Sequence, residues 1–159
     1  MSETYSARLT IGGSITRAAL ADLHKAAVSE GAELETPNEE MREFGVEDIA
    51  QTIIEEGTLT FIGEAAMGRF SEIEAVAKQH ELLFSAWSAS YFESPEETVV
   101  FDGVEEESLG MDDGYVSVSG KTIEEMLLML KSSQMDKLGA TLENLLPKRF
   151  VLPDALLVE

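Results

Sequence analysis

Residues 79–120 have the sequence QHELLFSAWSASYFESPEETVVFDGVEEESLGMDDGYVSVSG, forty-two residues without Lys or Arg. Three apolar runs, at residues 82–87, 98–101 and 115–118, have the composition and length of β-strands. Ten carboxylates lie between and around these runs. The stretch therefore predicts a region of sheet that displays the most acidic loops of the chain.

Upstream of this stretch, strands alternate with short helices. Residues 5–11 alternate apolar and polar side chains, as a half-buried strand does, and Gly12 and Gly13 are expected to end that strand. Ser14 is then the candidate N-cap of a helix that runs to Glu30. The other predicted elements are a helix at 46–56, a strand at 58–62, a helix at 70–80 that opens with the capping box of Ser71 and Glu74, a helix at 122–130 that opens with the box of Thr122 and Glu125, and a helix at 135–146.

The order of these elements indicates an α+β fold in which helices pack on one face of a mixed sheet. Residues 58–130 have the order β-α-β-β-β-α, which comes close to a ferredoxin-like split βαβ unit with an extra strand. The length of 159 residues fits a single domain, 1–159. The apolar tail at 150–159, FVLPDALLVE, is expected to dock on the body of the protein or on another subunit.

The charge of the chain is strongly unbalanced, with 31 acids against 11 bases and a formal net charge of −20. Because 44% of the residues are hydrophobic and recur with clear periods, this charge belongs to a folded surface and not to a disordered chain. Such a surface repels nucleic acid and anionic membranes and attracts basic proteins. We therefore expect a basic protein partner, with no direct binding of nucleic acid or membrane.

The compartment is suggested by what the sequence lacks. No cysteine is present, which excludes disulfides, thiolate metal sites and thiol nucleophiles. The first residues have no apolar segment typical of a signal peptide, and no run of about 18 apolar residues indicates a membrane span. The sequence therefore predicts a soluble, cytoplasmic protein.

Three glutamates lie at the ends of predicted helices, where the helix dipole disfavours them. Glu30 precedes Gly31, and Glu55 and Glu56 precede Gly57. Each placement costs about 0.3–1 kcal/mol relative to a neutral or basic side chain. We interpret these glutamates as an extension of the negative surface field.

No motif in the sequence assigns a reaction. Residues 12–14 lie where a phosphate-binding turn would be, but neither G-x-G-x-x-G nor a closing Gly-Lys-Ser/Thr follows. His24 and His80 belong to no metal-binding array and are expected to be structural. Residues 102–113 lack the ligand positions of a calcium loop. We expect no cofactor and no metal, and the sequence favours a non-enzymatic role.

The favoured hypothesis is an acidic binding or inhibitor protein that engages a basic, nucleic-acid-handling partner by mimicking nucleic acid. Anti-defence and immunity proteins are similar to this chain in composition. Its expected partner-binding site combines an acidic rim with aromatic anchors, as interface hot spots do. The residues of this expected site are Trp87, Tyr91, Phe92, Glu93, Glu96, Glu97, Glu105, Glu106, Glu107, Asp112 and Asp113.

Two alternatives stay open at this point. One is a small α+β enzyme or ligand-binding domain with a pocket near residues 12–14 and a histidine beside it. The other is a structural or assembly protein that self-associates as a homo-oligomer through residues 150–158.

Overall fold

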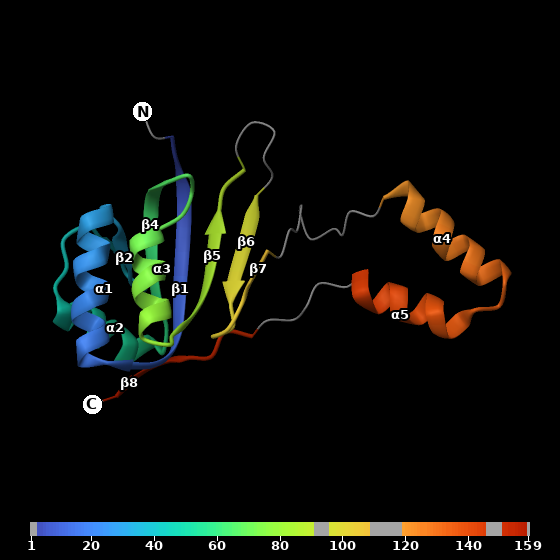
Figure 1. Cartoon of the computed structure of the whole chain (residues 1–159). Helices are drawn as coiled ribbons and strands as arrows, with labels where there is room; N and C mark the ends of the chain where they lie inside the picture. Colours follow the sequence, from blue (N-terminus) through green and yellow to red (C-terminus); the bar gives the residue numbers. More distant parts are fainter. Residues whose placement is uncertain (1–2, 91–95, 109–118, 146–150, 159) are drawn as a thin grey trace.

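A computed structural model describes residues 3–90, 96–108, 119–145 and 151–158 (Figure 1). The strand expected at 115–118 lies outside the described residues. The elements are β1 (Thr4–Thr16), α1 (Arg17–Glu30), β2 (Glu33–Glu35), β3 (Glu40–Met41), α2 (Val46–Glu56), β4 (Leu59–Ala66), α3 (Ser71–Gln79), β5 (Leu83–Ser88), β6 (Glu97–Phe101), β7 (Glu106–Ser108), α4 (Gly120–Lys131), α5 (Met135–Leu145) and β8 (Ala155–Val158).

Strand β1 is the centre of the sheet. It pairs antiparallel with β4 on one edge and with β5 on the other, so that Leu9 lies opposite both Phe61 and Ala86. The strand order is β3-β2-β4-β1-β5-β6-β7, and every neighbouring pair in this order is antiparallel. The two halves of the sheet are therefore joined through β1.

Two β-α-β units interlock around β1. The units β1-α1-β2 and β4-α3-β5 place their strands in the order β2-β4-β1-β5, which is the ferredoxin-like arrangement. The predicted α+β class is confirmed. The ferredoxin-like unit, however, spans residues 4–88 and not 58–130, because β4 and β5 both pair with the first strand of the chain. Strands β6 and β7 extend the sheet beyond β5.

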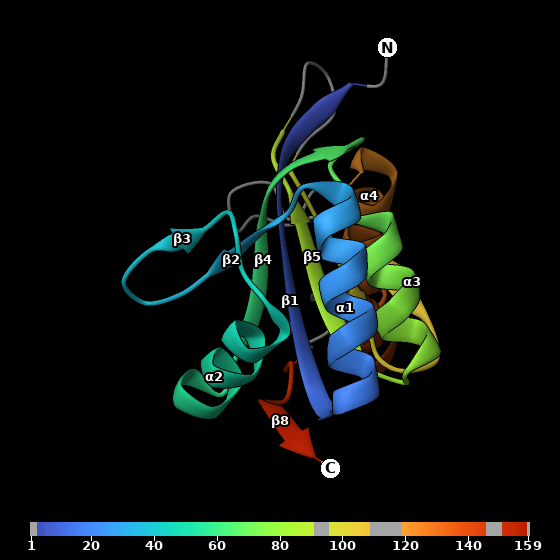
Figure 2. The same cartoon turned by 90° about the vertical axis from the view of Figure 1, so that its left-hand side faces the viewer.

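Helices α1 and α3 lie side by side on one face of the sheet (Figure 2). The alternation of β1 directs Leu9 and Ile11 into this layer, where they are buried in one cluster with Leu23 of α1 and Ile73 of α3. Helix α2 lies near β8 at the lower end of the sheet in both views, and its Ile53 joins the same cluster. One continuous core therefore connects the sheet with α1, α2 and α3.

The end of β1 differs from the prediction. Residues 12–14 do not break the strand, which continues to Thr16, and the cap of α1 is Thr16, whose hydroxyl accepts from the Ala19 N–H at 3.2 Å. The strand continues because β8 pairs parallel with its last four residues. The Gly13 N–H donates to the Asp154 carbonyl at 3.1 Å, and Ala155 is buried.

Two helix starts also differ from the prediction, for local reasons. Helix α3 has Phe70 at its N-cap position and no side-chain cap from its own segment, so the expected box of Ser71 and Glu74 is not formed. Helix α4 begins at Gly120, two residues early, because the Ser119 hydroxyl accepts from the Thr122 N–H at 3.2 Å.

Helices α4 and α5 form a hairpin that lies beyond the β7 edge of the sheet, apart from α1 and α3 (Figure 1). They pack against each other, and the Thr141 hydroxyl of α5 approaches the Met129 sulfur of α4 at 3.7 Å. No residue of α4 is buried. None of the described helices has the length and apolar composition needed to cross a bilayer.

Gly12 offers a test of the docking of the C-terminal segment. A Cβ added to Gly12 would lie 2.0 Å from the Pro153 carbonyl oxygen, so Gly12→Ala forces the segment away from β1. We expect a loss of about 1–3 kcal/mol in the free energy of unfolding, measured by urea denaturation with the fluorescence of Trp87, the single tryptophan. Gly120→Ala, which meets nothing within 4 Å, is the control. Equal urea midpoints for the two variants would contradict the described docking.

Candidate partner-binding surface

The face of the sheet opposite α1 and α3 carries the candidate surface, which we call the open face. On β1 the side chains of Ser6, Arg8 and Thr10 alternate with the buried ones and are exposed or half-buried. Register places Trp87 of β5 opposite Arg8 on one side and opposite Thr98 of β6 on the other. The open face therefore combines an aromatic side chain with polar strand residues, and it includes part of the predicted site.

Three of the predicted site residues share the open face. The half-buried Trp87 donates from its indole Nε1 to the Glu96 carboxylate. Glu107 of β7 lies opposite Val100 of β6, whose side chain is on the same face as that of Thr98. Trp87, Glu96 and Glu107 thus lie on one face of neighbouring strands, as an anchor with an acidic rim requires.

Two other predicted residues point to the opposite face, toward the helices. Glu97 pairs with Ser88 of β5 and accepts from the Ser108 hydroxyl at 2.8 Å. Glu106 lies opposite the buried Phe101 and forms ion pairs with Lys78 and Arg69. The hydrogen bond from Lys78 and the nearby charges of Lys78 and Arg69 lower the pKa of the Glu106 carboxyl below its ordinary 4.5. Glu106 is therefore a structural residue of this fold.

The remaining predicted residues are exposed or undescribed. Glu105 is exposed in the turn before β7, where its N–H donates to the Asp102 carboxylate at 2.9 Å. The predicted residues that lie outside the described ranges are Tyr91, Phe92, Glu93, Asp112 and Asp113.

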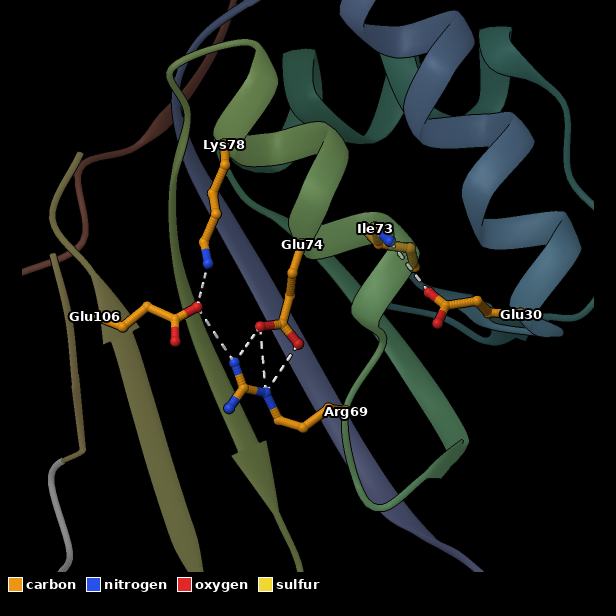
Figure 3. A network of polar contacts seen from close by, with 6 residues as sticks. All are labelled: Glu30, Arg69, Ile73, Glu74, Lys78 and Glu106. Carbon is orange, nitrogen blue, oxygen red and sulfur yellow. Dashed lines mark hydrogen bonds and ion pairs between the residues drawn. The ribbon is translucent and has the colours of Figure 1, made fainter. Parts of the chain in front are cut away.

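An ion-pair network ties the β7 edge to α3 (Figure 3). Glu74 is only 5% exposed and receives two bonds from Arg69 Nε, at 2.9 and 3.2 Å, and another from Arg69 Nη2. These bonds to Glu74 raise the pKa of the Arg69 guanidinium. Because Arg69 also contacts Glu106, which in turn binds Lys78, the network spans the gap between helix and edge strand. A carboxylate buried this deeply needs such a partner.

Glu30 has a role that the sequence analysis missed. Its carboxylate accepts from the Ile73 N–H at 3.1 Å, so that the last residue of α1 caps the first turn of α3 (Figure 3). Burial raises the pKa of the Glu30 carboxyl, although bonds from the Ile73 and Glu72 backbone act against that rise. The interpretation of Glu30 as an extension of the surface field is replaced by this capping role. The signal in the sequence was the lack of a capping side chain at Phe70.

Outside the α4–α5 hairpin, almost every described basic side chain forms an ion pair with a carboxylate of the same chain. Residues 3–90, 96–108 and 151–158, which we call the body, carry 23 acids and six bases, a formal charge of −17. Pairs on the surface include Arg8 with Glu35 at 3.0 Å and Arg42 with Glu33 at 3.1 Å. The five paired bases are Arg8, Arg17, Arg42, Arg69 and Lys78.

A hollow of about 370 Å³ lies on the open face beside Trp87. Arg8 and Arg42 line it together with Glu33, Glu64 and the apolar Ile62. The charges of both arginines are directed at Glu35 and Glu33, so the hollow offers a partner carboxylates and apolar surface. Within the described ranges, no group of three or more His, Asp or Glu side chains is arranged to hold a metal ion.

The two histidines and residues 12–14 have structural contacts. His24 Nε2 is 2.8 Å from the Phe44 carbonyl, and His80 Nε2 is 2.8 Å from the Asp22 carboxylate, which links α3 to α1. The C-terminal segment covers Gly12, at the place where the sequence suggested a pocket. Comparisons with protein-family models, curated proteins and solved structures find no match for this chain.

The Glu106 ion pair predicts a pH-dependent contribution to stability. A lowered pKa means that the folded state favours the charged form, so the contribution is present above pH 4.5 and is lost as the pH falls further. Glu106→Gln should lose roughly 0.5–1 kcal/mol in the free energy of unfolding at pH 7, because the pair is partly exposed. The difference in the free energy of unfolding between the wild type and Glu106→Gln, measured in urea titrations, should become smaller below pH 4.5. Glu105→Gln is the control, and a deficit that stays constant with pH would contradict this role.

The cap formed by Glu30 predicts opposite effects at equivalent helix ends. Glu30→Ala leaves the Ile73 N–H without its acceptor and should cost about 0.5–2 kcal/mol in the free energy of unfolding. Glu56→Ala, at the same position before Gly57, removes a carboxylate from a helix C-terminus and should be neutral or stabilising. Urea midpoints at pH 7 measure both effects. Similar midpoints for the two variants would show that Glu30 is not a cap.

Proposed function

We propose that the protein is a non-enzymatic binding protein whose acidic surface engages a basic partner, one that otherwise holds nucleic acid. The observation that carries the proposal is the internal pairing of the basic side chains of the body. Because Arg8, Arg17 and Arg42 are directed at neighbouring carboxylates, a partner meets a surface that is anionic and offers few cations in return. This is the electrostatic character of nucleic acid itself.

The open face gives the proposed contact its geometry. Trp87 is held in position by its bond to Glu96, and Glu107 lies on the same face two strands away. A fixed aromatic side chain inside a charged rim is the arrangement of interface hot spots, where one anchor contributes most of the binding energy. The acids around it would supply the long-range attraction that accelerates association with a basic surface.

The charge-reversal test follows from the two faces of the sheet. Glu96 and Glu107 are the residues to reverse, since Glu106 holds α3 and its reversal would place a third cation beside Lys78 and Arg69. The matched control is the double variant Glu124→Lys, Glu143→Lys on α4 and α5. It changes the net charge by the same amount but at positions away from the sheet.

We expect the chain, immobilised at about 50 mM salt, to retain a basic protein from a nuclease-treated extract of the cells that produce it. Mass spectrometry then identifies the retained protein. The Kd for that protein should weaken at least about tenfold between 50 and 500 mM salt. The Glu96→Lys, Glu107→Lys double variant should also bind the partner about tenfold more weakly, whereas the control variant should bind it as the wild type does. Duplex DNA should compete with the chain for the partner. An affinity that is insensitive to salt and to DNA would contradict the proposal.

A further inference from the structure

We infer that the α4–α5 hairpin is a self-association element, whose apolar face packs on the same face of a second copy to form a four-helix bundle. This surface is separate from the open face, and the inference does not depend on the basic partner proposed above. The observations that carry it are the arrangement of apolar side chains on the two helices, and their charge.

The apolar arc of α4 is wider than one neighbouring helix can cover. Met126 and Met129 are half-buried on the side that faces α5, where Met129 meets Thr141. Ile123, Leu127 and Leu130 form an adjacent stripe at the spacing of one helix face, and about half of each of these side chains is exposed. A helix that contacts two neighbours has such an arc, and α5 accounts for only one.

Helix α5 continues this apolar face. Leu138 and Thr141 are half-buried toward α4, while Met135 and Leu142 are exposed beside them. In an antiparallel helix pair with this seam, helical periodicity turns the exposed stripes of both helices to the same side. The hairpin is therefore a two-helix layer with one uncovered apolar face.

Charge favours a second copy as the occupant of this face. Residues 119–145 carry four acids and three bases, a formal charge of −1, whereas the body carries −17. Two copies that met through their bodies would bring like charges together, but two hairpins can meet with both signs represented on each side. Identical faces related by a two-fold axis form a closed dimer, and helical hairpins paired in this way complete a four-helix core.

The size of the face suits a reversible dimer. Helices of 12 and 11 residues give a layer roughly 18 Å long and two helix diameters wide. That is at the small end of specific interfaces, so we expect dissociation in the micromolar range. Higher salt should leave the dimer unchanged or tighten it, since salt screens the repulsion between the two bodies. This response to salt is opposite to the one expected for binding of the basic partner.

Leu127 and Leu128 provide a matched pair for the test. Leu127 is 49% exposed within the apolar face, whereas Leu128 is 66% exposed and lies a further 100° around the helix, on the side of Lys121 and Glu124. In sedimentation velocity of the full chain from about 2 to 200 µM, the wild type and Leu128→Glu should dimerise and Leu127→Glu should stay monomeric. Trp87 fluorescence reports that the body is folded in each variant.

Crosslinking gives a second measurement, because the chain has no cysteine of its own. Under mild oxidation, Leu127→Cys should form a disulfide-linked dimer at least about tenfold faster than Leu128→Cys. A wild type that is monomeric at 200 µM would overturn the inference. So would a dimer that survives Leu127→Glu, or one that is lost instead on Leu156→Glu in the exposed part of β8.

Discussion

The structure depends on the pairing of one strand, β1, with neighbours on both of its edges. Its backbone is hydrogen-bonded to β4 on one side and to β5 on the other, and its last four residues pair with β8. Since Leu9 and Ile11 from this strand also enter the core beneath α1 and α3, strand pairing and core packing are fixed by the same residues. The core of the body is therefore held together by apolar burial and backbone hydrogen bonds, and the ion pairs of Arg69 and Lys78 add the attachment of the β7 edge.

The separation of an apolar core from a charged surface explains how so acidic a chain can fold. Most acids lie at strand ends, in turns and on the open face, where water solvates them at little cost to the core. Three carboxylates near the helices make specific structural contacts. Glu74 and Glu106 bind cations that fasten the β7 edge, and Glu30 caps α3 from 43 residues away in sequence. The exposed surface of the body is accordingly anionic.

Local patterns predicted the helices of the body, its four longest strands (β1, β4, β5 and β6) and the α+β class, because helical and strand periods are short-range properties. They did not predict that the ferredoxin-like unit begins at β1, which depends on pairing between residues 48 to 62 positions apart. Nor could they show that β8 would extend the strand through Gly13. In the candidate site, Trp87 and Glu106 lie on opposite faces of the sheet, which can be seen only when the strand register is known. Glu30 lies at an unfavourable helix end when only the sequence is considered, and its role depends on the tertiary contact with Ile73.

We propose that the acidic body folds by itself, whereas the near-neutral hairpin is completed by the hairpin of a second copy. Hydrogen exchange measured by mass spectrometry at about 2 and 200 µM protein tests it most directly. The amides of β1 at Leu9 and Ile11 should be strongly protected at both concentrations, whereas those of α4 and α5 should gain protection only at the higher one. Protection of α4 equal to that of β1 at 2 µM, or none at 200 µM, would contradict the account.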